Sequence, residues 1–172
     1  GGNSNLLCVN NFMYDIRSSG SGVNTNTSLG IYGSPDNRGD RYYYNSIDLS
    51  GRDSSTSPES FSVGIWLDDG SESFQLLNNI VTNSMTIAGS GVGNKAYCLF
   101  VPAGGWPSGS TSDRNDLFAS GPQGVVGLFN SLNLVTLGNW QSATGQDANS
   151  VSGDPLFVSN DNLHIQSAGI SP

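Results

Sequence analysis

The sequence predicts an all-β chain folded as a right-handed parallel β-helix of about four to five coils, with one short helix near residues 136–144. Three observations lead to this prediction: an apolar run that recurs with a constant period, a second apolar run that follows each recurrence, and abundant turn-forming residues. Of the 172 residues, 23 are Gly and only 12% are charged, whereas 9% are aromatic. This composition favours a folded chain with many turns over either a helical protein or a disordered one.

The recurring run ends in asparagine. Asn11, Asn45 and Asn79 are each 34 residues apart, and Asn115 follows 36 residues later. A constant period is required where every strand lies on the equivalent strand of the next coil, about 4.8 Å away. We expect coils to start near residues 6, 42, 75, 112 and 151. Because asparagine suits tight corners and its amide can bond neighbouring coils, the four asparagines are predicted to stack as a ladder.

The second apolar run follows the asparagine at a nearly fixed delay. Gly30 follows Asn11 at the same spacing at which Gly64 follows Asn45, and Tyr97 follows Asn79 one position sooner. A β-sandwich would show no such constant period, and a propeller blade would need about four strands in each repeat. The four second runs are Leu29–Tyr32, Val63–Trp66, Ala96–Phe100 and Val126–Phe129.

The pattern changes after residue 129. Thr136 is a suitable N-cap for a helix over residues 136–144, Leu137 and Trp140 fall on one helical face, and Gly145 is suited to end it. Two further apolar runs, at residues 151–158 and 163–165, predict short strands. The helix therefore interrupts the repeat before the last strands.

This last part of the chain carries a resemblance to a known family. Residues 139–150 (NWQSATGQDANS), 154–158 (DPLFV) and 163–166 (LHIQ) resemble the C-terminal part of large secreted right-handed β-helix repeat proteins of the pectin-lyase-like superfamily. Residues 44–51 and 78–83 resemble the same group. The resemblance covers nearly the whole chain. It implies the β-helix fold and an extracellular or cell-surface location in Bacteroidetes-like bacteria.

Charge excludes several partners. The chain has 6 Lys and Arg against 14 Asp and Glu, for a net charge of −8, so it lacks the basic surface that nucleic acid requires. No apolar run approaches the length of a membrane span, which takes roughly 18 residues or more, so membrane insertion is not expected. Both ends look cut from something longer, and we expect a single segment over residues 1–172. Open strand edges at its ends favour end-to-end stacking with other copies.

Acidic residues offer the candidates for catalysis. The pair Asp68 and Asp69 is a candidate for carbohydrate chemistry, because polysaccharide lyases and glycoside hydrolases use carboxylates on this fold. A solvated turn is the preferred interpretation of the pair. The only histidine, His164, lies far along the chain from both. Asp113 and Asp116 are a candidate Ca²⁺ site, although their spacing lacks the pattern of known calcium loops. No cofactor or metal is otherwise expected.

Two further sets of residues have alternative interpretations. Trp66 and Trp106, with Trp140 as a third, are either core residues or exposed contacts for a polysaccharide. Cys8 and Cys98 lie within apolar runs and are either buried thiols, which we favour, or a disulfide.

The sequence therefore predicts a structural or adhesive module, such as a stalk, adhesin segment or filament subunit, rather than an enzyme. The alternatives are a carbohydrate-active enzyme and a glycan-binding module on the same fold.

Overall fold

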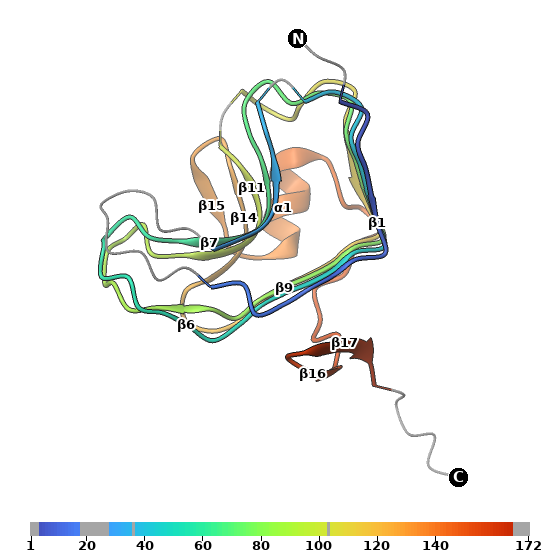
Figure 1. The fold of residues 1–172 in the computed structure, drawn as a ribbon. Coiled ribbons are helices and arrows are strands. Elements are labelled where there is room, and N and C mark those ends of the chain that lie inside the picture. The colour runs from blue at the N-terminus through green and yellow to red at the C-terminus, as the bar shows by residue number, and fades with distance from the viewer. Residues whose placement is uncertain (1–3, 18–27, 36, 103, 167–172) are drawn as a thin grey trace.

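The computed structural model describes residues 4–17, 28–35, 37–102 and 104–166. In these ranges the chain is built of short strands with one helix, as Figure 1 shows, and the all-β prediction is confirmed. Three main sheets are present. Sheet A contains β1 (Leu7–Val9), β4 (Arg41–Tyr43), β8 (Gln75–Leu77) and β12 (Thr111–Asp113). Sheet B contains β2 (Phe12–Met13), β5 (Ser46–Leu49), β9 (Ile80–Asn83) and β13 (Asp116–Ala119).

Sheet C closes the third side. It contains β3 (Ser28–Gly33), β7 (Ser62–Leu67), β11 (Ala96–Val101), β14 (Gly124–Phe129) and β15 (Leu132–Leu134). Between sheets B and C, β6 (Arg52–Asp53) pairs with β10 (Thr86–Ile87). Over the described residues, the chain passes through sheets A, B and C in that order four times.

Neighbouring strands within sheets A and B are parallel, and their register follows the sequence repeat. In sheet A, Leu7 lies opposite Arg41 and Arg41 lies opposite Gln75, which reproduces the step between the asparagines. In sheet C the first four strands are parallel as well, whereas β15 returns antiparallel to β14. The period seen in the sequence is thus the register of sheets A and B and of β3, β7 and β11 in sheet C, whereas β14 follows β11 after a shorter step, with Gly124 opposite Ala96.

The larger of two buried hydrophobic clusters lies between the three sheets, whose arrangement Figure 1 shows. Each sheet contributes the side chains that alternate toward the interior, and buried members come from all of them. These include Tyr42 and Leu76 from sheet A, Ile47, Val81 and Leu117 from sheet B, and Ile65, Leu67 and Leu99 from sheet C.

Glycines recur in sheet C because the interior leaves no room for a side chain there. A Cβ on Gly64 would lie 2.2 Å from Val81 Cγ1 and 2.8 Å from the carbonyl oxygen of Cys98. A Cβ on Gly30 would lie 2.5 Å from the carbonyl oxygen of Gly64. The interior is therefore closely packed at this level, which explains the glycine in the first two of the second apolar runs.

The predicted helix is confirmed as α1 (Leu137–Thr144). Thr136 Oγ1 accepts a hydrogen bond from the backbone N–H of Asn139 at 3.2 Å, and Gly145 ends the helix in the left-handed conformation at φ 68°. Trp140 is fully buried and packs edge-to-face against Phe129. The helix thus covers the core at the end of the stack where β14 lies, which corrects the expectation that both ends are open.

The expected fifth unit near residue 151 does not form a further set of stacked strands. Val151 makes an isolated parallel bridge with Asp116. The chain then forms an antiparallel hairpin of β16 (Phe157–Ser159) and β17 (Asn162–Ile165). This hairpin brings the ring of His164 edge-to-face against Phe12, with 5.0 Å between ring centroids. The last described residues therefore fold back beside the first ones.

Both cysteines are free thiols, so the disulfide alternative is not realised. Cys8 lies in sheet A, is half-buried and accepts a hydrogen bond from Asn11 Nδ2. Cys98 lies in sheet C, is fully buried, and its Sγ contacts the carbonyl oxygen of Val81 at 3.4 Å. Burial raises the pKa of both thiols.

Candidate functional site

The four repeating asparagines lie in one row at the corner between sheets A and B. Asn11 Nδ2 donates to Asn45 Oδ1 at 2.9 Å, and Asn45 Nδ2 donates to Asn79 Oδ1 at 3.0 Å. Asn79 Nδ2 continues to Asn115 Oδ1 at 3.1 Å. In each step the backbone N–H of the donating residue bonds to the same oxygen, at 2.9–3.2 Å. Every step of this asparagine row is therefore a pair of hydrogen bonds.

The buried members of the row use their second amide hydrogen as well. Asn45 Nδ2 donates to the carbonyl oxygen of Cys8, and Asn79 Nδ2 donates to that of Tyr42. Asn115 Nδ2 donates to that of Leu76. A buried amide left without partners would cost about 1–3 kcal/mol for each unmade bond. Each buried asparagine instead joins the repeat unit before it to the unit after it.

The residue before each asparagine has a left-handed backbone. Asn10, Tyr44, Asn78 and Arg114 have φ values of 56°, 54°, 58° and 56°. Such values are uncommon for residues other than glycine and turn the chain sharply. The turn directs the next residue, the asparagine, into the interior. Corner geometry and asparagine row are therefore two parts of one local structure.

A residue that the sequence analysis missed ends the row. Asp147, which is 1% exposed, accepts from Asn115 Nδ2 at 3.0 Å through Oδ1. Ser150 Oγ donates to the same oxygen at 2.7 Å, and Trp140 Nε1 donates to Oδ2 at 2.8 Å. Asp147 also has a left-handed backbone, at φ 60°. In the sequence, the only sign of this role is that Asp147 is an acidic residue slightly less than one repeat period after Asn115.

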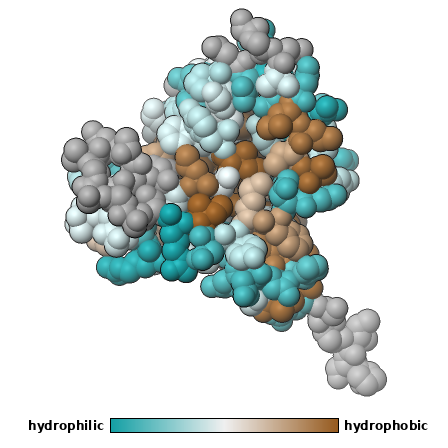
Figure 2. Space-filling model, in the orientation of Figure 1, coloured by the Kyte–Doolittle hydropathy of each residue, from teal (hydrophilic) through white to brown (hydrophobic). Residues whose placement is uncertain are grey.

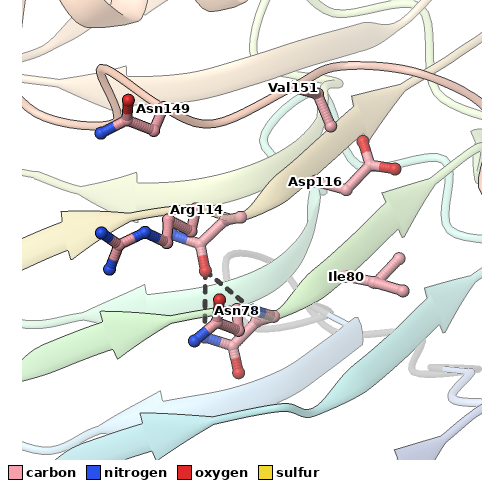
Figure 3. Close-up of a pocket in the computed structure, with 8 residues that line it drawn as sticks. Asn78, Ile80, Arg114, Asp116, Asn149 and Val151 are labelled. Atoms are coloured by element: carbon pink, nitrogen blue, oxygen red, sulfur yellow. Dashed lines mark hydrogen bonds between the residues drawn. The ribbon is translucent and has the colours of Figure 1, made fainter.

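A groove of about 470 Å³ runs over the corner that the row occupies. Figure 3 shows that Arg114 and Asn149 point to one side of it, whereas Asp116 and Val151 lie on the other. The acidic and basic side chains of this groove therefore diverge. They do not converge on one point where a substrate atom could react.

Asp113 and Asp116, the candidate Ca²⁺ site, have separate hydrogen-bond partners. The Asp113 carboxylate accepts from Asn149 through its backbone N–H at 2.8 Å and its Nδ2 at 2.9 Å, and the side-chain bond lowers the pKa of Asp113. Asp116 Oδ1 accepts from the backbone N–H of Gly153 at 3.0 Å, while burial raises the pKa of Asp116. Over the described ranges, no group of three acidic, His or Cys side chains is arranged to hold a metal ion.

Asp68 and Asp69 form a turn after β7. Asp68 Oδ1 accepts from the backbone N–H of Asp69 at 2.9 Å, and its Oδ2 accepts from the hydroxyl of Tyr32 at 2.5 Å. The bond to Asp68 raises the pKa of the Tyr32 hydroxyl. His164 lies elsewhere, beside Phe12. The pair therefore has the hydrogen-bond partners of a turn and is not brought to the histidine.

The acidic turn does share a groove with one predicted aromatic contact. Asp68, Asp69 and Glu72 line a groove of about 530 Å³ together with Trp106. Trp106 is half-buried, packs edge-to-face on Phe74 at 5.5 Å, and donates from Nε1 to the carbonyl oxygen of Ser110. The candidate acidic pair, Asp68 and Asp69, and the candidate glycan contact Trp106 therefore line the same groove, which we call the acidic groove.

The other two tryptophans, Trp66 and Trp140, pack against aromatic side chains of the chain itself. Trp66 lies on the outer face of sheet C against Phe100, with 4.6 Å between ring centroids, and near Tyr32 at 5.6 Å. Its Nε1 is buried, so it is turned away from any ligand in solvent. Trp140 is fully buried and cannot contact a polysaccharide.

A scan against protein-family models, a search of curated proteins and a search of solved structures each find no match. The one helix of the described residues, α1, is not long and apolar enough to cross a membrane. The assignment of a function therefore depends on the geometry of the chain itself.

Proposed function

We propose that the chain is a segment of a right-handed parallel β-helix and serves as a structural or adhesive module of an extracellular bacterial surface protein, such as a stalk or filament segment. The single observation that supports this most is the asparagine row. Its paired hydrogen bonds connect four successive units along one line, in register with the parallel strands. Each of these units is one coil of the proposed β-helix.

A row of this kind suits a mechanical role. Pulling the ends of a coil stack apart separates neighbouring coils, so the load falls on the strand pairing and on the row together. Each intramolecular hydrogen bond contributes roughly 0.5–1.5 kcal/mol, and every asparagine step adds two to those of the sheets. The row therefore strengthens the connection between coils along the axis of the stack.

The mechanical role can be tested by pulling single molecules from residue 4 and from the exposed residue 143 of α1, which lies at the opposite end of the stack. The wild type should resist extension more strongly than Asn79→Ala, which breaks the row in its middle. Asn160→Ala, in the exposed turn of the β16–β17 hairpin, is the matched control and should behave as wild type. Equal unfolding forces for all three chains would contradict the proposal.

An enzymatic role is tested separately. We expect no release of reducing or unsaturated ends from a broad panel of polysaccharides. Turnover by the wild type that disappears in Asp68→Asn or Asp69→Asn would replace the structural proposal with the carbohydrate-active enzyme.

The acidic groove supports a second candidate, a glycan-binding module. Carboxylates accept hydrogen bonds from sugar hydroxyls, and Trp106 offers part of an aromatic face. Because three carboxylates repel uronic acids, the candidate ligand is a neutral polysaccharide. Binding of a neutral polysaccharide that Asp69→Asn weakens, while the exposed control Asp161→Asn does not, would favour this function.

A further inference from the structure

We infer that the end of the stack formed by β1, β2 and β3 is a docking face for one further coil of the same repeat, parallel to β1 and β2 and carrying an asparagine at its corner. This inference depends on the coil arrangement of the proposed function, but not on its surface location or its mechanical role. The partner is an apolar strand–corner–strand segment that has a side-chain amide to donate.

The asparagine row has a direction. Asn11, Asn45 and Asn79 each donate their backbone N–H and their Nδ2 to the next asparagine along the chain, never to the one before. Asn11 therefore donates to Asn45, and its remaining amide hydrogen bonds go to Val9 and Cys8. Among the described residues, no group donates to Asn11 Oδ1. In Asn45 and Asn79, the same Oδ1 atom accepts the hydrogen bonds from the asparagine of the preceding coil.

Equivalent interior positions differ in burial at this end. Met13 of β2 is only half-buried, whereas Ile47, which lies opposite it in β5, is completely buried. Likewise Cys8 is half-buried and its partner Tyr42 is 1% exposed. A coil stacked on the other side accounts for the difference, because Ile47 and Tyr42 have one on each side. The docking face is thus the continuation of an interface that occurs three times within the stack.

The exposed end is apolar and uncharged. Figure 2 views the molecule from this end and shows apolar side chains gathered between polar ones. Leu6 is 51% exposed at this end. Leu7 is also 51% exposed, although its register partners Arg41 and Gln75 are exposed as well, and Phe12, which contacts His164 of the hairpin, is 46% exposed. Residues 4–14 contain no charged side chain, although the chain as a whole has a net charge of −8. An edge strand without charge or proline invites strand pairing, since nothing in it opposes a neighbour.

The opposite end excludes a second copy as the parallel occupant. Asp147 closes the asparagine row there, and its backbone N–H bonds to the carbonyl oxygen of Ser112 in β12. Leu117 of β13 bonds to the carbonyl oxygen of Val151, and Trp140 fills the core. These contacts occupy the positions that a head-to-tail copy would need. The coil that docks must therefore come from a stack that is open on its C-terminal side.

Adding such a coil to the chain tests the inference. A copy of residues 38–71, placed directly before Ser4 in place of residues 1–3, sets the copied Asn45 one full period before Asn11. We expect the midpoint of thermal unfolding to rise by at least about 5 °C in a single transition. The backbone N–H of the copied asparagine should exchange with solvent at least about tenfold more slowly than in an unfolded peptide.

Two controls separate a specific dock from added length. The same extension with alanine in place of its copied asparagine should give a smaller rise in the midpoint. The same extension attached after Gln166, where the row is closed, should give no rise. An extension before Ser4 that leaves the midpoint and its own exchange unchanged overturns the inference, whatever the pulling experiment shows.

The size of the unextended chain provides the remaining outcome. We expect a monomer by light scattering at micromolar concentration. A dimer that Leu7→Lys dissociates, with an unchanged circular dichroism spectrum, would show that a second copy covers this face by antiparallel pairing. That result would overturn the parallel coil as its occupant.

Discussion

Asn115 Nδ2 lies 3.0 Å from Asp147 Oδ1, and with this contact the asparagine row passes from an amide to a carboxylate. The last donors of the row need acceptors outside it: Asn115 Nδ2 donates to Asp147, and the backbone N–H of Asn115 donates to Ser150 Oγ at 2.8 Å. A carboxylate meets this requirement, because it has two acceptor oxygens and no hydrogen to place. Asp147 receives Asn115 and Ser150 on one oxygen and Trp140 on the other. The end of the row and the aromatic cover of the core are thereby joined.

Asp147→Asn should weaken this termination. Asparagine tolerates a left-handed backbone, but it replaces one of the two acceptor oxygens with a donor. In either orientation of the new amide, that donor faces a buried N–H, of Trp140 or of Asn115. We expect a loss of about 1–3 kcal/mol in the free energy of unfolding. Denaturant titration followed by tryptophan fluorescence measures it, and Asp161→Asn in the exposed turn should stay within about 0.5 kcal/mol of wild type.

Asn79→Ala should break the row in its middle. It removes the oxygen that accepts both the backbone N–H and the Nδ2 of Asn45, and it removes the Nδ2 that donates to Asn115 Oδ1. Since these groups are buried, we expect a loss of about 3 kcal/mol or more in the free energy of unfolding. Chemical denaturation of Asn79→Ala and of Asn160→Ala compares a row position with an exposed asparagine. Similar stability of the two variants would show that the row contributes little.

Two glycines should respond to alanine with opposite signs. Gly64→Ala places a Cβ 2.2 Å from Val81 Cγ1 and 2.8 Å from a backbone oxygen, so sheets B and C must separate. Overpacking of this kind costs about 1–3 kcal/mol or more. Gly138 lies in α1, and a Cβ there would lie 4.0 Å from Thr136 Oγ1, so the added methyl group has room. Gly138→Ala should therefore stabilise the chain by about 0.5–1 kcal/mol. Thermal unfolding should therefore shift downward for the first variant and upward for the second.

Asp116 should make stability depend on pH. Burial raises the pKa of Asp116 in the folded chain, so the native state binds its proton more tightly than the unfolded one. Wild type then gains stability from this group as pH falls toward the ordinary carboxyl range. Asp116→Asn, which keeps an oxygen for Gly153, should be more stable than wild type at pH 7. This advantage should shrink on acidification, as measured by urea midpoints at pH 7 and pH 3.

Asp113 should change stability with pH in the opposite direction from Asp116. The side chain of Asn149 lowers the pKa of Asp113, so its contribution is present at neutral pH and disappears as pH falls through the lowered value. Asp113→Asn should therefore be slightly less stable than wild type at pH 7, with the two chains converging at low pH. The effect should be small because the group is partly exposed. Parallel pH profiles for the two variants would contradict both assignments.

The two thiols should differ in reactivity. Because Cys98 is fully buried and Cys8 is half-buried, native protein should react slowly with iodoacetamide at Cys8 and not at Cys98. After denaturation without reductant, mass spectrometry should find two added labels. A denatured chain that takes up no label would reveal a disulfide instead.

The repeat could be predicted because parallel stacking copies it directly into the sequence. Asn11, Asn45 and Asn79 recur at the spacing of the strand register, and Thr136 and Gly145 bound the helix through local capping chemistry. These features depend on residues close in sequence or on strict periodicity. Both can be recognised in a single chain without knowledge of tertiary contacts.

Other features depend on contacts that periodicity does not contain. Asp147 was missed because the step is shorter and the residue type changes where the row ends. The hairpin after residue 155 was expected to stack, since a short apolar run does not indicate whether its partner is a strand of the preceding repeat unit or the next strand along the chain. The burial of Trp140 and the shared groove of Asp68 and Trp106 depend on loops whose paths no local pattern determines.

The left-handed corner residues also determine where this chain can vary. Asn10, Tyr44, Asn78 and Arg114 adopt the same backbone angles, yet their side chains are amide, phenol, amide and guanidinium. Successive corners are one strand spacing apart, about 4.8 Å, so these side chains follow one another in a line on the outside. The asparagine behind each of them maintains the turn. A single substitution at any of these four positions can therefore change which side chain is exposed along that line, while the spacing between successive corners stays constant.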